Sequence, residues 1–109
     1  MVADVVAAER SFDISIARRH IENGISTLRV KQGDQVIIRW RTDEAASVHL
    51  HGYDIAAALT PSAPVRMRFT ADVTGRFRIT AHRFGEDQAK NDRRQTHHEL
   101  PLLYLEVHP

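Results

Sequence analysis

The stretch VRMRFTADVTGRFRITAH, residues 65–82, decides the fold class of this chain. Apolar residues fill every second position on both sides of a short break, and arginine or threonine fills most positions between them. Side chains alternate between the two faces of a β-strand, so this pattern predicts strands with one face in a core and one in water. Thr74-Gly75 is a turn signal between the two runs. We therefore expect two strands here, joined by a turn.

The same period of two continues outside this stretch, and glycine-bearing turn signals separate the runs. The run near the end of the chain is apolar nearly throughout, which indicates a strand that is central or buried on both faces. Seven short strands at this spacing predict an all-β fold, a Greek-key β-sandwich that forms a single domain over residues 1–109. The further candidate strands are residues 12–17, 25–30, 36–41, 48–53 and 102–107.

Two segments stand apart from this pattern. Residues 1–10 are expected to form a flexible N-terminal segment, and residues 83–98 are expected to form a long polar loop of the kind that carries function or is mobile. A helical interpretation fits only residues 54–59 and residues 86–94.

Composition excludes several classes of protein. The 109 residues carry a formal net charge of +1, which gives no general argument for a nucleic-acid partner. No run approaches the roughly 18 apolar residues that span a bilayer, so we expect no membrane insertion. The chain has no cysteine, which excludes disulfides, zinc-thiolate sites, thiol nucleophiles and blue copper.

Histidine placement supplies the main chemical signal. His49 and His51 lie two residues apart, so both rings project from one face if their segment is a strand. Such a pair suits a borderline metal ion such as copper or zinc. The alternative is a pair of polar side chains on a solvated face. His20 and His108 belong to no cluster and are expected at the surface.

Three more histidines flank the long polar loop. His82 opens the loop, and His97 and His98 close it, so they converge if the two strands are neighbours. No nucleophile elbow, phosphate-binding loop or spaced carboxylate pair is present, and we therefore expect no enzymatic activity.

The order of motifs resembles the cupredoxins. The carriers of the resemblance are LRVKQGDQVIIRW (residues 28–40), HGYDI (51–55), FTADVTGRFRITAH (69–82) and the closing strand at 102–107. The resemblance implies a copper site and places His51 and one of His97 or His98 at ligand positions. Ala81 stands at the position of the family's cysteine, and no methionine follows His98.

These features together predict a copper-binding protein with a non-blue, all-histidine site, with zinc as a possible substitute. The expected ligands are drawn from His49, His51, His82, His98 and His97. Its expected role is copper binding, storage or delivery in the periplasm or another exported location, after removal of a signal peptide.

Two alternatives remain open at this stage. The first is an enzyme with a type 2-like copper centre. The second is a metal-free interaction module whose arginine-bearing sheet face meets an acidic protein partner. The arginines expected on that face are Arg39, Arg41, Arg66, Arg68, Arg76 and Arg78.

Overall fold

The computed structural model describes residues 8–84 and 99–109, which form nine β-strands in two sheets. The all-β sandwich is confirmed, but with nine strands where the sequence predicted about seven. The two additional strands are β2, which has only two residues, and β6. The strands are β1 (Glu9–Ala17), β2 (His20–Ile21), β3 (Thr27–Lys31), β4 (Gln35–Thr42), β5 (Ala46–Leu50), β6 (Ile55–Leu59), β7 (Val65–Thr70), β8 (Gly75–His82) and β9 (Leu100–His108).

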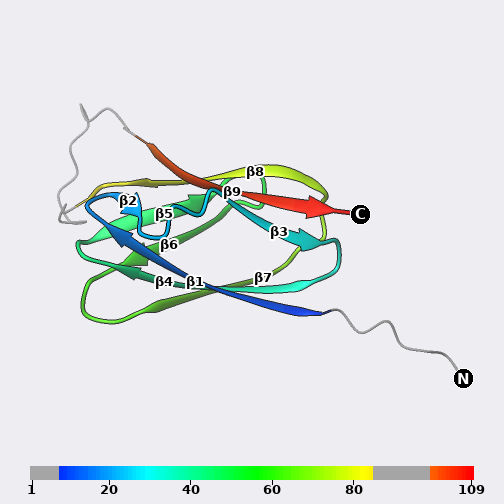
Figure 1. Cartoon of the computed structure of the whole chain (residues 1–109), viewed down its shortest axis with the longest axis horizontal. Coiled ribbons are helices and arrows are strands. Elements are labelled where there is room, and N and C mark those ends of the chain that lie inside the picture. The colour runs from blue at the N-terminus through cyan, green and yellow to red at the C-terminus, as the bar shows by residue number, and fades with distance from the viewer. Residues whose placement is uncertain (1–7, 85–98) are drawn as a thin grey trace, which may run out of the picture.

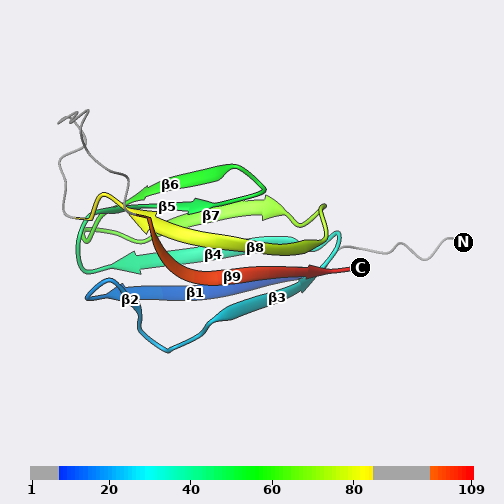
Figure 2. The same cartoon turned by 90° about the horizontal axis from the view of Figure 1, so that it is seen from above.

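The two sheets pack face to face as layers (Figure 1). One sheet has the strand order β2-β1-β4-β7, and the other has the order β3-β9-β8-β5-β6, which can be followed across the molecule in Figure 2. The β1–β4 and β3–β9 pairs are parallel, and the other pairs are antiparallel. The closing strand β9 lies between β3 and β8. The interpretation of its apolar run as a central strand is therefore confirmed.

The period of two places the core between the sheets. Val36, Ile38 and Trp40 on β4 are fully buried, and residues of β8 and β9 such as Ile79 and Leu105 face them from the opposite sheet. The residues between them along each strand are exposed or half-buried. Each sheet therefore has one face in the core and one outer face that can carry polar side chains.

The helical interpretation of residues 54–59 is wrong, because β6 occupies this segment. Gly52 and Asp54 have positive φ angles of 89° and 61°, which let the chain turn tightly after β5. β6 then runs back along β5, pairing Ile55 with Leu50, and Leu59 becomes buried. Residues 86–94 lie outside the described residues. Within the described part of the chain, no helix is long and apolar enough to cross a membrane.

The boundaries of the two predicted irregular segments shift slightly. β1 begins at Glu9, which pairs with Gln35 and lies inside the segment expected to be flexible. Arg83 and Phe84 follow β8 directly, and the rest of the predicted loop up to residue 98 is outside the described residues.

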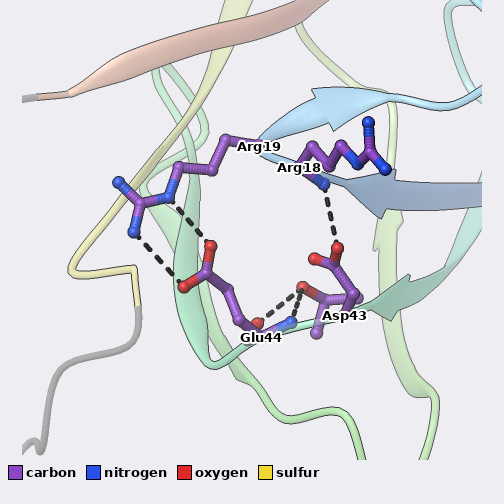
Figure 3. Close-up of polar contacts among 5 residues, drawn as sticks. Arg18, Arg19, Asp43 and Glu44 are labelled. Atoms are coloured by element: carbon purple, nitrogen blue, oxygen red, sulfur yellow. Dashed lines mark hydrogen bonds and ion pairs between the residues drawn. The ribbon is translucent and has the colours of Figure 1, made fainter.

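A polar network fixes the β1–β2 turn (Figure 3). The backbone N–H of Arg18 donates to Asp43 Oδ2 at 2.9 Å, and the Arg19 guanidinium binds both carboxylate oxygens of Glu44 at 2.8 and 3.3 Å. The hydrogen bond to Glu44 is the main reason that the pKa of Arg19 is raised. The same guanidinium lies 5.0 Å from the centre of the Phe84 ring. These contacts hold the end of β8 against the other sheet.

Candidate metal site

β5 places His49 on the outer face of the five-stranded sheet, because Val48 and Leu50 on either side of it point into the core. His51 follows the strand, and its backbone N–H donates to the carbonyl of Arg78 on β8 at 2.9 Å. The two imidazole rings lie side by side, with centroids 4.1 Å apart and planes tilted by 44°. The prediction that both rings share one face is therefore confirmed.

Thr80 on β8 lies beneath the two rings. Thr80 pairs with His49 across the β5–β8 ladder and is only 2 % exposed. Its hydroxyl lies 3.0 Å from Nε2 of His51, a hydrogen bond whose direction depends on the imidazole tautomer. The hydroxyl thereby holds the His51 ring against the sheet, and the contact satisfies a polar group that is otherwise buried.

Glu99, just before β9, completes a three-residue group. Its Oε1 lies 3.2 Å from Nε2 of His51, and its Oε2 lies 4.0 Å from Nδ1 of His49. One donor atom from each of the three residues lies within 4.8 Å of the others. Glu99 is not among the ligands predicted from the sequence, although it stands directly after the His97-His98 pair.

An irregularity in β9 explains why Glu99 faces the histidines. Ile79 pairs with Leu103, but the next residue of β8, Thr80, pairs with Pro101, so Leu102 is an extra residue. A bulge of one residue transfers the side chains beyond it to the opposite face of the sheet. Without it, Glu99 would have the same phase as the core residue Leu103. Periodicity alone therefore gives the wrong face for this carboxylate.

A second carboxylate lies close to the pair. Oδ1 of Asp54 is 3.6 Å from Nε2 of His49, and the Asp54 side chain is 96 % exposed. Glu99 and Asp54 approach the imidazoles from β9 and from the β5–β6 turn, respectively. The two negative charges favour a cation at this position over an anion.

The donor set fits a divalent ion such as Cu(II) or Zn(II). Metal–ligand distances of about 2.0–2.1 Å place the ligand atoms of a tetrahedral site roughly 3.3 Å apart. The separations of 3.2 Å from Glu99 to Nε2 of His51 and 4.0 Å to Nδ1 of His49 are close to this value. A metal bound through Nε2 of His51 would replace the hydrogen bond between that nitrogen and Thr80. The residues do not fit a blue-copper centre, since the cysteine position is Ala81, which is fully buried in the core.

Of the other predicted ligands, the structure describes His82 alone. His82 is the last residue of β8, opposite Ser47, and does not belong to the group of His49, His51 and Glu99. His97 and His98 lie outside the described residues, so their convergence with the site stays a prediction. His51 lies opposite Arg78, three positions before Ala81 along β8, or about 10 Å at the rise of a β-strand. The site lies on the outer face of the sheet over Thr80, next to Ala81 along β8, whose own side chain is buried in the core.

Comparison with solved structures shows the cupredoxin fold. Auracyanin A, a "blue" copper protein from Chloroflexus aurantiacus, superposes with a TM-score of 0.56 at 13 % identity, covering 92 % of this chain and 99 % of its own. A chain of a heme-copper terminal oxidase gives a TM-score of 0.57 at 15 % identity, covering 93 % and 76 %. The fold predicted from the motif order is therefore confirmed.

A third similar structure is the copper nitrite reductase from Nitrosomonas europaea, with a TM-score of 0.59 at 16 % identity. The match covers 93 % of this chain but 42 % of the reductase, so this chain spans less than half of that protein's length. No family model matches the sequence, and no curated protein matches it.

Proposed function

We propose that this cupredoxin-fold chain binds copper as a cargo ion through His49, His51 and Glu99, in periplasmic copper binding, storage or delivery. The observation that carries the proposal is the convergence of two imidazoles and one carboxylate on a single sheet face. Nitrogen and oxygen sites bind Cu(II) more tightly than Zn(II), which favours copper, with zinc as the weaker alternative. The proposed role is binding and not catalysis.

The surroundings of the site suit storage or delivery better than electron transfer. Without a thiolate ligand, the site lacks the strong copper–sulfur bond that tunes blue-copper centres. Ala56 on β6 pairs with His49, and Ala58 pairs with Ser47; both alanines are exposed and small. They leave the outer side of the histidine pair uncovered on the β6 side. A cargo ion held there is accessible to an exchanging partner.

Titration of the apoprotein with Cu(II), followed by optical and EPR spectra, tests the proposal. We expect stoichiometric binding, with nitrogen hyperfine structure from imidazole and no intense absorption near roughly 600 nm, where thiolate charge transfer occurs in blue sites. Failure of the full chain to bind Cu(II) would contradict the proposal. An intense blue colour would show that the donor set is wrong.

A second candidate function rests on the opposite face of the molecule. The six arginines expected to form one face are divided: Arg76 and Arg78 lie on β8, in the histidine-bearing sheet. The remaining four, on β4 and β7, are exposed on the outer face of the four-stranded sheet. They are Arg39, Arg41, Arg66 and Arg68.

The arginine face has a shallow hollow and an unfavourable charge pair. Arg39, Arg66 and Arg68 line a hollow of about 340 Å³ that Glu9 and Asp13 also border. Arg39 and Arg66 are directly opposite each other in the β4–β7 ladder, an arrangement that destabilises a sheet. Asp13 offsets part of this repulsion, since its Oδ1 lies 3.7 Å from Nε of Arg39. The four arginines still outnumber the two bordering carboxylates, and this excess of positive charge suits an acidic protein partner. This face therefore supports the alternative function, an interaction module.

A further inference from the structure

We propose that the site of His49, His51 and Glu99 holds copper as Cu(II) and releases it when a one-electron reductant converts the ion to Cu(I). This inference rests on the proposed copper function. It adds the oxidation state that the site selects and the event that unloads it.

The chemistry of the donors is the first argument. The site offers two imidazole nitrogens and a carboxylate oxygen. Sulfur ligands select Cu(I), whereas carboxylates suit harder, more highly charged ions. The chain has no cysteine, and the sulfur atom of the described residues belongs to Met67, which is 3 % exposed in the core of the other sheet. The donor set therefore favours Cu(II).

The charge of Glu99 is the second argument. Its carboxylate lies 3.2 Å from Nε2 of His51, with its side chain 32 % exposed, so solvent screens it only in part. Coulomb attraction is proportional to charge, and reduction from +2 to +1 halves the attraction between the ion and this carboxylate. Asp54, 3.6 Å from His49, acts in the same direction from the other side.

The arrangement of the rings is the third argument. Cu(I) bound by two imidazoles prefers a linear geometry, with the two nitrogens facing each other across the ion. His49 and His51 instead project side by side from one sheet face, with centroids 4.1 Å apart. The two residues stand two positions apart in one extended segment, which directs both rings to the same side of the sheet. The sheet thus opposes the linear geometry that would retain Cu(I).

The release step conserves both electrons and atoms. One electron passes from the reductant, for example ascorbate, to Cu(II), which becomes Cu(I), and the reductant is oxidised by one electron. The coordination bonds to the two nitrogens and the oxygen break, and each donor recovers its lone pair. The freed Cu(I) is taken up by an acceptor with soft ligands. No bond within the protein is broken.

Competition titrations of the full chain test this inference. The affinity for Cu(II) is measured aerobically, and the affinity for Cu(I) is measured without oxygen, each against a chromophoric chelator specific for that oxidation state. We expect Cu(II) to bind at least about a hundredfold more tightly, a difference of about 2.7 kcal/mol. Adding ascorbate and a Cu(I) chelator to the loaded protein should remove the copper and abolish the Cu(II) EPR signal.

Two variants sharpen the test. Glu99→Gln keeps the shape but removes the charge, so it should weaken Cu(II) binding about tenfold and change Cu(I) binding little. Glu106→Gln is the matched control, because Glu106 is a carboxylate on the neighbouring strand β9 that contacts Arg29, Arg76 and His108 and does not belong to the group of His49, His51 and Glu99. It should leave both affinities unchanged.

The outcomes separate the two proposals. If Cu(I) binds as tightly as Cu(II), or if ascorbate leaves copper bound, the redox inference fails while the copper function stands. If Glu99→Gln weakens both oxidation states equally, the role of the charge is wrong. If the parent protein binds Cu(II) no better than the His49→Ala/His51→Ala variant does, the proposed function itself fails.

Discussion

The two outer faces of the sandwich carry opposite chemistry on the same architecture. The face of the five-stranded sheet gathers His49, His51 and Glu99, whereas the face of the four-stranded sheet exposes four arginines. Alternation along regular strands produces the arginine face. The histidine face also needs a bulge that turns Glu99 outward. Composition alone therefore does not determine where a site forms, since one extra residue in β9 completes it.

Removal of both imidazoles should have the largest effect. We expect His49→Ala/His51→Ala to weaken Cu(II) binding at least about a hundredfold, or about 2.7 kcal/mol, because two of the three donors are lost. Each single substitution should cost tenfold or more. Isothermal titration calorimetry with a competing chelator measures these changes. The variant also leaves the buried Thr80 hydroxyl without its partner His51, so the free energy of unfolding should fall by about 1 kcal/mol while the fold is kept.

A substitution on the opposite face of the sandwich is the control for this prediction. Arg66→Ala removes an exposed side chain from the arginine face, and the variant should bind Cu(II) as tightly as the parent. If the single His51→Ala variant and Arg66→Ala bind copper equally well, the histidine face is not the copper site.

The sequence predicts the arginine face more fully than the histidine face, for a physical reason. Strands with a strict period of two, such as β4 and β7, can be assigned to faces residue by residue. His49 and His51 follow the same rule, and their shared face is confirmed. The period of two does not assign Glu99 to this face, because a bulge at Leu102 reverses the phase of the strand. Pro101, beside the extra residue, is the sequence signal that could have indicated the bulge.

The strand β6 shows a second limit. Ile55-Ala56-Ala57-Ala58-Leu59 consists of good helix formers and alternation is hidden when alanine fills three positions. Pairing with β5 overrides this local preference.

The prediction that Arg76 and Arg78 belong to the arginine face is wrong for another reason. Periodicity tells which side of a strand is exposed but not which sheet contains the strand, and that depends on long-range pairing.

The turn that follows His51 should be the next most sensitive position. A Cβ atom at Gly52 would collide with ring atoms of Phe77, and its φ of 89° disfavours any L side chain. Gly24 also has a positive φ, 71°, but open space around it. We expect Gly52→Ala to lower the free energy of unfolding by about 2 kcal/mol more than Gly24→Ala does.

Urea denaturation of the two alanine variants measures this difference. Because Gly52 adjoins His51, Gly52→Ala should also weaken Cu(II) binding, whereas Gly24→Ala should not. Equal unfolding free energies for the two variants would show that the Phe77 ring moves aside at no cost, and that the turn does not constrain the histidine face.

Tyr53 links the two sheets and gives a smaller, pH-dependent effect. Its hydroxyl donates to the carbonyl of Val73 at 2.7 Å and accepts from the N–H of Val73 at 2.9 Å, while its ring packs against Phe69 and Phe77. Burial raises the pKa of Tyr53 above its ordinary value of 10.0, and Asp72 adds to the increase, although the hydrogen bond with Val73 opposes it. We expect Tyr53→Phe to cost about 1 kcal/mol near neutral pH.

The sign of the pH dependence follows from the raised pKa. Above about pH 10 the unfolded chain loses the phenolic proton before the folded chain does, so stability falls as the pH rises. Below that pH the contribution is fully present. Chemical denaturation of the parent and of Tyr53→Phe between pH 8 and pH 11 should show a difference that shrinks at the alkaline end. A constant difference would mean that the proton of Tyr53 is not linked to folding.

Charge reversal on the arginine face should produce the smallest effect and the sharpest contrast with the histidine face. Arg66 lies directly opposite Arg39, so Arg66→Glu replaces a repulsive cross-strand pair with an attractive one. Because Glu9 and Asp13 border the same hollow, the free energy of unfolding should rise by no more than about 0.5 kcal/mol. Arg78→Glu, on the other sheet, is the matched control.

Binding of a poly-glutamate peptide tests whether Arg66 serves a partner. A substitution that stabilises the fold but weakens binding of this peptide would indicate that Arg66 contributes to an acidic partner's binding surface. Fluorescence anisotropy at low ionic strength should then show weaker peptide binding by Arg66→Glu than by Arg78→Glu, and the difference should disappear at high salt, where exposed charges are screened. Copper affinity should stay unchanged in Arg66→Glu. If both reversals weaken the peptide complex equally, attraction by the whole molecule explains it and the arginine face is no docking surface.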